Sequence, residues 1–377
     1  MPKIRTIEII PLEYVIPKER LYGISRGPNL KRTSTLVAVT TESGVTGYGE
    51  TISPAAPVKA GLPALLPLYL GRSVHEAGLL HARAASLAQD VGAAGFAGCL
   101  SALDMALHDA AGKVLNRPVC DLIGGRGRER VPCYATTGYI TSGGLSGLEA
   151  QLAAVDRTAF TGVKIKIGLG PPSDLARVRL AREILGDAML LMVDVNANYD
   201  VATALQSARL IAPYDIHWYE EPLPAHDISG HASLRARSPI PIATGEGITR
   251  LADFKALLDA RGADIIQPAL ARCGGVSGAH AVAALCEAAG SRVTLGVWGG
   301  ACLLAASAHV MASRAMTGHA ASRPFPHMLE FDLGQNPLRE AIARRPLRPE
   351  GGSVRVPEGP GFGVVLDPAA MDAYRAA

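Results

Sequence analysis

The chain has 377 residues, of which 48% are hydrophobic and 19% are charged, and its 37 Lys and Arg nearly balance its 34 Asp and Glu. This composition supplies apolar material for a large core and excludes a disordered or fibrous chain. A formal net charge of +3 gives no strong positive field, and no dense basic run with interleaved aromatic residues occurs, so we expect no nucleic-acid partner.

No segment of the sequence has the pattern of a membrane span or a secretory signal. The richest apolar stretch, residues 293–310, is interrupted by glycines, Trp298 and His309. The N-terminal MPKIRTIEII lacks the long apolar core and small-residue cleavage site of a signal peptide. Six cysteines are scattered without a CxxC pair, which favours buried reduced thiols. We therefore expect a cytoplasmic protein with no membrane partner.

Residues 1–125 predict an α+β unit. Residues 4–16 and 34–50 have the apolar patterns of β-strands, and Gly44 suits a hairpin turn within the second stretch. Residues 17–31 are polar and contain Gly and Pro, which is typical of a surface loop. From 55 to 115 the apolar spacing becomes helical. Strands followed by helices indicate an α+β arrangement, and the Gly-rich run at 124–127 is a plausible boundary.

The remainder of the chain alternates short apolar runs with helical stretches, at a spacing of about 25 residues for most of the series. The runs are 131–138, 163–168, 190–196, 216–223, 240–246, 264–270, 292–298 and 328–332. Parallel strands need crossover helices, so this pattern favours an α/β fold with a modified (β/α)8 TIM barrel. An open doubly wound sheet is the alternative, but no run here leads into a GxGxxG motif.

Three acidic residues recur at the ends of successive apolar runs. Asp194, Glu220 and Glu246 are separated by 26 residues each time, which is about the length of one βα unit. In a barrel they would meet at the C-terminal rim, where barrel enzymes place their chemistry. Clustered carboxylates need a neutralising cation, and hard oxygen ligands suit Mg²⁺. The sequence therefore predicts a Mg²⁺ site, and the alternative is that each acid caps the following helix.

Two lysines precede these acids by one strand. Lys164 and Lys166 point to the same face because side chains alternate along a strand. A parallel barrel strand has no solvated face, so we expect both lysines to point into the barrel at its rim. Two lysines, three carboxylates and a divalent cation sum to +1, which would attract an anion such as a substrate carboxylate. A lysine beside another cation can have its pKa lowered to roughly 7–8, the range of a general base.

Taken together, the motifs resemble the enolase superfamily, in its mandelate racemase and muconate lactonizing enzyme branch. The resemblance covers nearly the whole chain. It rests on Lys164-x-Lys166, Asp194-Val195-Asn196, Trp218-x-Glu220-Glu221-Pro222, Gly245-Glu246 and Gly274-Gly275, with Gly47-Tyr48-Gly49-Glu50 upstream. Within the branch, Gln267-Pro268, Cys273-Gly274-Gly275, Val297-Trp298-Gly299, Glu330-Phe331-Asp332 and Asn336-Pro337 look most like galactarolactone cycloisomerases and acid-sugar dehydratases.

The resemblance implies an architecture and a mechanism. Residues 1–125 would form an N-terminal α+β capping domain, 126–327 the catalytic barrel, and 328–377 the last barrel strand with a segment that packs back on the cap. Mg²⁺ held by Asp194, Glu220 and Glu246 would bind the substrate carboxylate. Lys166 would remove the α-proton, while Lys164 and the metal stabilise the enediolate.

Glu330 matches an eighth-strand glutamate that donates a hydrogen bond to the substrate carboxylate in mandelate racemase. The alternative reading is an acid satisfied by nearby backbone. The resemblance further suggests that residues 17–31 cover the barrel mouth. Tyr22 and Arg26 would there reach a polyhydroxy or second carboxylate group, with solvent exposure as the alternative, and Asn196, Tyr139 and Trp298 would also contact substrate. A homo-oligomer is a family expectation.

The sequence departs from the family pattern at the positions of the second general acid or base. Ala269 and Gly296 (or Trp298, if the alignment slips) occupy strand-six and strand-seven positions where relatives carry proton-transferring residues. His309 and His319 are candidates for a displaced base, although His309 is more typical of a packed core histidine. A single base favours β-elimination: dehydration of an acid sugar or cycloisomerisation of its lactone, so a lyase or isomerase. The alternatives are a racemase or epimerase, and a catalytically impaired metal-binding homologue.

Overall fold

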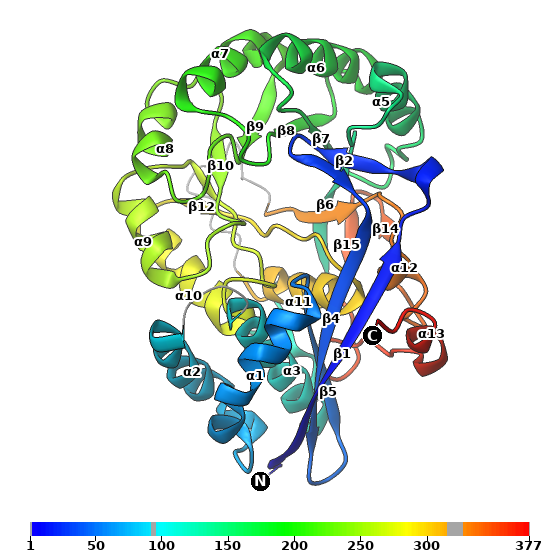
Figure 1. Ribbon diagram of the computed structural model, residues 1–377, viewed down its shortest axis with the longest axis vertical. Coiled ribbons are helices and arrows are strands. Elements are labelled where there is room, and N and C mark those ends of the chain that lie inside the picture. The colour runs from blue at the N-terminus through cyan, green and yellow to red at the C-terminus, as the bar shows by residue number, and fades with distance from the viewer. Residues whose placement is uncertain (1, 92–95, 315–326, 377) are drawn as a thin grey trace.

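The N-terminal part of the chain packs an antiparallel sheet against helices in the computed structural model, which describes residues 2–91, 96–314 and 327–376 (Figure 1). The sheet order is β1 (Ile4–Val15), β4 (Lys31–Thr41) and β5 (Thr46–Thr51). A turn containing Gly44, whose φ is +84°, joins β4 to β5. The helices are α1 (Ala55–Tyr69), α2 (Ala77–Val91), α3 (Phe96–Val114) and α4 (Val119–Leu122), with a 3-10 turn, η2 (Val74–Glu76). The predicted α+β cap is confirmed.

The segment expected as a surface loop forms a hairpin instead. After a 3-10 turn, η1 (Lys18–Arg20), strands β2 (Tyr22–Ile24) and β3 (Gly27–Asn29) pair with each other. Gly23 bridges to Ile140 of the barrel, and Ser25 Oγ donates a hydrogen bond to the Val195 carbonyl. The hairpin therefore lies on the barrel (Figure 1). Three-residue strands are too short to leave a period-two pattern, which is why the sequence predicted only a loop.

The second part of the chain is a closed barrel of parallel strands. Within the described residues these strands are β6 (Arg130–Thr137), β7 (Gly162–Lys166), β8 (Leu190–Asp194), β9 (Ile216–Glu220), β10 (Ile242–Thr244), β11 (Ile265–Ile266), β12 (Arg292–Val293) and β13 (Leu329–Asp332). Strands β6 to β12 are neighbours in sequence order, and β13 pairs with β6. A parallel bridge between Leu295 and Leu329 closes the ring. The predicted TIM barrel is confirmed.

Helices surround the barrel strands (Figure 1). They are α5 (Gly144–Ala153), α6 (Pro171–Leu185), α7 (Val201–Ile211), α8 (Ile228–Arg235), α9 (Leu251–Asp259), α10 (Gly275–Ala288) and α11 (Ala301–Ala312), with a 3-10 turn, η3 (Ala212–Tyr214). Val163 and Ile165 of β7 join the core cluster that contains the helices' apolar side chains. A separate cluster with Met192 and Trp218 fills the barrel interior. The strands thus place alternate residues inward, in agreement with the expectation that Lys164 and Lys166 point into the barrel.

The C-terminal segment returns to the cap. It contains α12 (Pro337–Glu340), β14 (Pro349–Glu350), β15 (Ser353–Arg355) and α13 (Pro368–Asp372). Strand β15 pairs antiparallel with β6, while Leu338 and Met371 pack into the same cluster as Ile10 and Leu12 of β1. The C-terminal segment therefore contacts both the cap and the barrel. The domain boundaries at 125 and 327 stay predictions.

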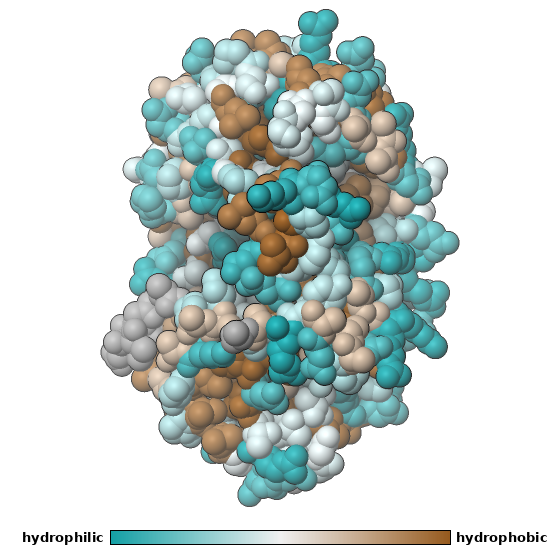
Figure 2. Space-filling model, turned by 45° about the vertical axis from the view of Figure 1, so that its right-hand side comes forward, coloured by the Kyte–Doolittle hydropathy of each residue, from teal (hydrophilic) through white to brown (hydrophobic). Residues whose placement is uncertain are grey.

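The surface in view is mostly hydrophilic, with hydrophobic residues gathered in separate patches (Figure 2). Among the helices the structure describes, none is long and apolar enough to cross a membrane. The six cysteines are buried free thiols, as the sequence predicted.

Candidate active site at the barrel mouth

The two lysines and two of the acids meet at the C-terminal ends of β7, β8 and β9. The strand register places Lys166 opposite Asp194 and Asp194 opposite Glu220. Lys166 Nζ lies 2.5 Å from Asp194 Oδ2, and Lys164 Nζ forms an ion pair with Glu220. All four side chains are buried. The inward orientation predicted from strand alternation therefore brings these residues together.

Both lysines are held as cations in this arrangement, which is opposite to the lowered pKa expected of a general base. Burial alone would lower the pKa of Lys166, yet the neighbouring carboxylates, Asp194 first, together raise that pKa above its ordinary value. The pKa of Lys164 is raised in the same way, against the effect of burial, by Glu220 and Glu330. Each buried ammonium thus has a carboxylate partner, as buried charges require.

Donors from three elements fix the orientation of the acids. The Asn196 backbone N–H donates to Asp194 Oδ1 at 2.9 Å. Trp218 Nε1 and Gln267 Nε2 donate to Glu220 Oε2 at 2.8 and 3.0 Å. Trp218 and Gln267 are members of the sequence motifs, but no sequence pattern indicates that their side chains donate to Glu220.

Glu246 lies beyond the end of its strand and is paired with a fourth carboxyl group. β10 ends at Thr244, so Glu246 occupies the turn that follows. Its partner is Glu221, whose pKa is raised to about 10 by burial and then by the nearby charges of Glu246 and Asp194. Regular alternation along β9 would turn Glu221 to the face opposite Glu220. It contacts Glu246 instead, because Glu221 has φ of +40°, where the regular alternation of the strand ends.

The acids fit a divalent cation by composition but are not arranged around one as they stand. Across residues 2–91, 96–314 and 327–376, no group of three or more His, Cys, Asp or Glu side chains is placed to hold a metal ion. The reason is that Asp194 and Glu220 contact lysines and Glu246 contacts Glu221. Burial also raises the pKa of Glu220 to about 8, which Lys164 offsets only in part. The raised pKa values mean that these carboxyl groups resist ionising together, and a cation would stabilise their charged forms once they turned toward it.

Glu330 accepts hydrogen bonds at both oxygens. Its Oε1 accepts from Thr136 Oγ1 at 2.6 Å and lies 2.9 Å from Lys164 Nζ. Its Oε2 accepts from the Val297 backbone N–H at 2.6 Å. All three partners are donors, so the geometry agrees with the reading of Glu330 as a satisfied acid. Its donation of a hydrogen bond to substrate stays a prediction.

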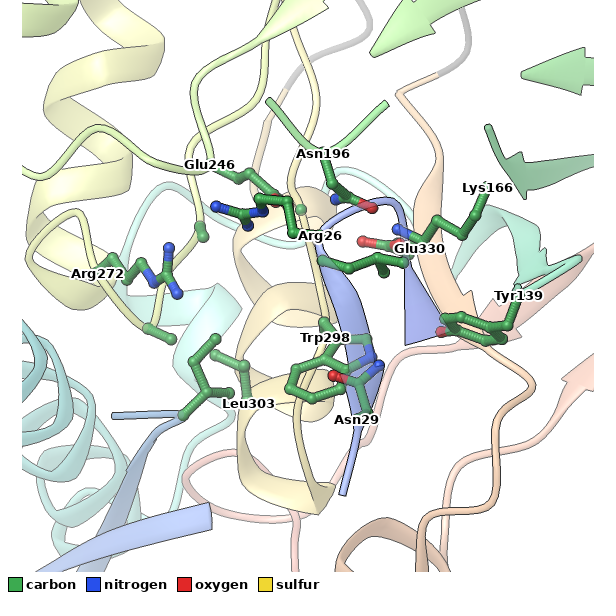
Figure 3. Close-up of a pocket in the computed structure, with 15 residues that line it drawn as sticks. Arg26, Asn29, Tyr139, Lys166, Asn196, Glu246, Arg272, Trp298, Leu303 and Glu330 are labelled. Atoms are coloured by element: carbon green, nitrogen blue, oxygen red, sulfur yellow. The ribbon is translucent and has the colours of Figure 1, made fainter. Parts of the chain in front are cut away.

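A cavity of about 230 Å³ opens between the cap hairpin and the barrel rim (Figure 3). This volume is below the ~300–1,000 Å³ typical of sites for drug-sized ligands, so the cavity suits a small molecule. Ile24, Arg26 and Asn29 of the cap line it together with Lys166, Asn196, Glu246, Arg272, Trp298 and Glu330 of the barrel. The expectation that residues 17–31 cover the barrel mouth is thus met by the hairpin.

The two departures from the family pattern follow β11 and β12, the sixth and seventh barrel strands, across the ring from β7, which carries Lys166. Ala269 and Gly296 both line the cavity and are bridged to each other as parallel strand neighbours. A Cβ atom at Gly296 would lie 3.6 Å from Glu246 Oε2, so this position faces the acid cluster. Neither side chain can transfer a proton.

Aromatic residues form the remaining wall. Tyr139 donates its hydroxyl to Asp332 Oδ1 at 2.5 Å, and Trp298 packs against the Arg32 guanidinium at 4.7 Å. Both residues line the cavity, and their contact with substrate stays a prediction. Tyr22 does not, because its ring packs behind that of Tyr139 at 4.5 Å between centroids. Its contact with substrate is therefore an expectation that this geometry does not favour.

His309 is a packed core residue. It is fully buried in α11, where its Nδ1 accepts a hydrogen bond from the Cys120 N–H at 3.2 Å. Burial lowers the pKa of His309 to about 4. It does not line the cavity, so it offers no second base there. His319, the other candidate, lies outside the described residues.

The buried imidazole predicts a loss of stability in mild acid. A histidine with an ordinary pKa near 6.5 in the unfolded chain takes up a proton below that pH, whereas folded His309 stays neutral until about pH 4. The free energy of unfolding should therefore fall as pH drops below 6.5, by about 2 kcal/mol at pH 5 from this residue alone.

Urea unfolding at pH 7 and pH 5 measures this effect. The variant His309→Asn keeps an acceptor for Cys120 but does not titrate. It should be less stable overall and less sensitive to pH. An unchanged pH dependence in His309→Asn would show that other groups carry it.

Comparison with known proteins agrees with this fold and site. Residues 10–124 match the mandelate racemase / muconate lactonizing enzyme N-terminal domain, and residues 147–370 match the enolase C-terminal domain-like family. The chain belongs to the enolase superfamily, in the mandelate racemase and muconate lactonizing enzyme branch.

The names of individual relatives indicate which classes of reaction occur among similar proteins. The D-galactarolactone cycloisomerase of Agrobacterium fabrum is 34% identical over 92% of both chains. The L-talarate/galactarate dehydratase of Salmonella typhimurium is 36% identical over 47% of this chain and 45% of its own. A racemase from Streptomyces coelicolor A3(2), solved with bound magnesium, is 27% identical with a TM-score of 0.83 over 99% of this chain and 100% of its own. The protein is an enzyme, a lyase or isomerase of this superfamily.

Proposed function

We propose that this enzyme uses Lys166 to abstract the α-proton of a small carboxylate, an acid sugar or its lactone, and completes a β-elimination. The elimination is either a dehydration or a cycloisomerisation. The observation that carries the proposal is the position of Lys166: a buried amine on the wall of a small cavity, opposite Ala269 and Gly296. Relatives named as a cycloisomerase and a dehydratase support the reaction class.

Asp194, Glu220 and Glu246 would hold the Mg²⁺ ion that the chemistry needs. When bound, this ion supplies positive charge for the substrate carboxylate, which makes the adjacent hydrogen more acidic. The excess of buried carboxyl groups at the barrel mouth and the magnesium bound in a related structure support this assignment.

Lys164 has a separate role in the proposal. It is 1% exposed and forms ion pairs with Glu220 and Glu330, so its ammonium group is fixed by two acids. A preorganised positive charge stabilises the negative charge that develops on the substrate when the α-proton leaves. Lys166, which lines the cavity, acts from its neutral form, which a cation held by Asp194 would favour by neutralising that carboxylate. After abstraction it holds the proton and can deliver it to the leaving group on the same face.

The missing second base predicts the stereochemistry of exchange. Because Ala269 and Gly296 cannot protonate the opposite face, a slowly reacting substrate analogue in D₂O should exchange its α-hydrogen with retention of configuration. Proton NMR and chiral chromatography follow exchange and epimer formation. Formation of the inverted epimer at a rate comparable to elimination would instead indicate a racemase or epimerase with a base at another position.

A screen of acid sugars and their lactones tests the proposed function as a whole. Dehydration yields a keto acid, which carbonyl reagents detect, and opening or closure of a lactone changes the charge of the product. No conversion and no α-hydrogen exchange across the panel, with Mg²⁺ present, would contradict the proposal and favour a homologue without this activity.

A further inference from the structure

The motif Gly47-Tyr48-Gly49-Glu50 ends in a glutamate that joins the cap to the barrel. Glu50 lies on β5 of the cap and is fully buried. Its Oε1 accepts a hydrogen bond from the Gly300 N–H at 2.5 Å, and its Oε2 accepts one from the Leu303 N–H at 2.8 Å. Ser34 of β4 donates its hydroxyl to Oε1 at 2.9 Å. Glu50 therefore connects the cap sheet to the start of α11 in the barrel.

Glu50 supplies both hydrogen bonds of a helix capping box from outside the helix. Gly300 is the N-cap residue of α11 and has no side chain, and Leu303, three residues later, is apolar. In an ordinary capping box these two positions hold a Ser or Thr and a Glu or Gln, whose side chains bind each other's backbone N–H groups. Here one carboxylate binds both N–H groups. The start of α11 is therefore fixed by a side chain of the cap.

A glycine at position 300 is needed for this contact. A Cβ atom there would lie 2.6 Å from Glu50 Oε1 and 2.7 Å from the Leu338 carbonyl oxygen, which is closer than non-bonded atoms approach. The preceding residue is also held, because Asn336 Nδ2 donates to the Gly299 carbonyl at 2.7 Å. Two polar side chains, Glu50 and Asn336, thus fix the backbone of this turn.

The turn that Glu50 holds carries part of the cavity wall. Trp298 comes two residues before Gly300, and both Trp298 and Leu303 line the cavity. In the close-up these two side chains lie at the lower edge of the cavity, whereas Lys166 lies at the upper edge (Figure 3). Displacement of the start of α11 would therefore move this wall and leave the lysine in place.

We propose that Glu50 is a positioning residue for the active site, which fixes the wall formed by Trp298 and Leu303 and thereby sets the affinity for substrate. Glu50 does not itself line the cavity, so it acts through α11. This inference goes beyond the proposed reaction, and only its kinetic readout rests on that reaction. A wall contact made equally in the ground state and the transition state affects KM, so its loss should raise KM more than it lowers kcat.

Glu50→Gln tests the proposal with the smallest change of shape. The amide has a single oxygen acceptor, so one N–H group of α11 loses its partner and faces an NH₂ donor. On the best substrate of the acid-sugar screen, KM should rise about tenfold while kcat stays within about threefold of wild type. Acrylamide should also quench the fluorescence of the free variant more strongly. Of the chain's two tryptophans, Trp298 is partly exposed and reports on the wall, whereas Trp218 is fully buried.

A double-mutant cycle shows whether Glu50 acts through the wall. If it does, Trp298→Ala should raise KM by a smaller factor in the Glu50→Gln background than in the wild-type background, because the contact is already impaired. Factors that simply multiply in the double variant would mean that the two residues act independently, and would overturn the proposal.

Asp109→Asn is the matched control. Asp109 is another buried acid of the cap that accepts two backbone N–H groups, from Tyr48 and Phe362 at 2.8 Å each. Phe362 belongs to the C-terminal segment and does not line the cavity. Asp109→Asn should lower the Tm, as Glu50→Gln does, but it should leave KM and quenching unchanged. Equal changes of KM in both variants, or none in Glu50→Gln, would show that Glu50 only stabilises the fold.

Ser34→Ala decides the question if Glu50→Gln does not fold. It removes one donor to Glu50 Oε1 but leaves both N–H groups of α11 with their acceptor. The freed carboxylate should hold α11 less firmly, so KM should rise about two- to fivefold. An unchanged KM in Ser34→Ala would overturn the proposal.

Failure of the proposed function gives a different result. In that case the wild type converts no acid sugar or lactone, yet quenching of Trp298 in the free protein still compares Glu50→Gln (or Ser34→Ala, if the former does not fold) with Asp109→Asn. Stronger quenching only in the variant that disturbs Glu50 would support the positioning role. Equal quenching in that variant and the control would overturn it.

Discussion

Lys166→Ala is expected to reduce turnover by about 10³-fold or more, because a positioned general base contributes about 10²- to 10⁴-fold and no neighbour replaces it. Lys166→Arg should be nearly as inactive, since a guanidinium group stays protonated and cannot accept the α-proton. Steady-state kinetics on the best substrate of the acid-sugar screen measures both variants.

Two controls separate loss of the base from loss of the fold. Lys255→Ala removes an exposed lysine that is paired with Asp259 on the surface of α9, and it should leave turnover unchanged. Because Lys166→Ala leaves the buried Asp194 without its closest cation, circular dichroism and thermal melts must show that the variant is folded. Lys166→Ala that is folded and keeps a tenth of wild-type turnover would exclude Lys166 as the base.

Removal of divalent metal has the second large expected effect. Chelation should abolish turnover and added Mg²⁺ should restore it, because several buried carboxyl groups at the barrel mouth have too few cations to balance them. Glu220→Gln removes one of the three proposed ligand charges, so it should weaken Mg²⁺ binding measured by calorimetry by at least about tenfold.

Glu149→Gln, on the exposed surface of α5, is the matched control and should bind Mg²⁺ as the wild type does. Elemental analysis of the chelated protein establishes that metal has been removed. Full activity in a verified metal-free preparation would show that Asp194, Glu220 and Glu246 serve another purpose.

The barrel was predictable because its strands are buried on both faces. Such strands appear in sequence as short apolar runs, and each of the expected runs overlaps a barrel strand. The inward direction of Lys164 and Lys166 was predictable for the same reason, since a charged residue within an apolar strand run cannot face the surrounding helices. The run at 292–298 shows the limit: regular pairing stops at Val293, and only single bridges at Leu295 and Gly296 continue the barrel.

The residues that sequence reasoning missed lie where regular geometry ends. Glu221 has a positive φ, so the period of two no longer describes its direction. Arg272 is in a turn after a two-residue strand, and no periodicity marks a residue there. Tyr22 was placed at the substrate because its loop was expected there, but the hairpin turns its ring behind Tyr139. Arg272 lies two residues after the apolar run at 264–270. This position was the signal available in the sequence, since barrel sites form after strand ends.

The central claim is abstraction of a substrate α-proton by Lys166, and incorporation of solvent deuterium tests it most directly. The enzyme is incubated with each acid sugar or lactone and Mg²⁺ in D₂O, and NMR follows the α-hydrogen of recovered substrate and product. We predict exchange with at least one compound in wild-type protein and in Lys255→Ala, and none in Lys166→Ala. Exchange that persists at the wild-type rate in Lys166→Ala would contradict the account.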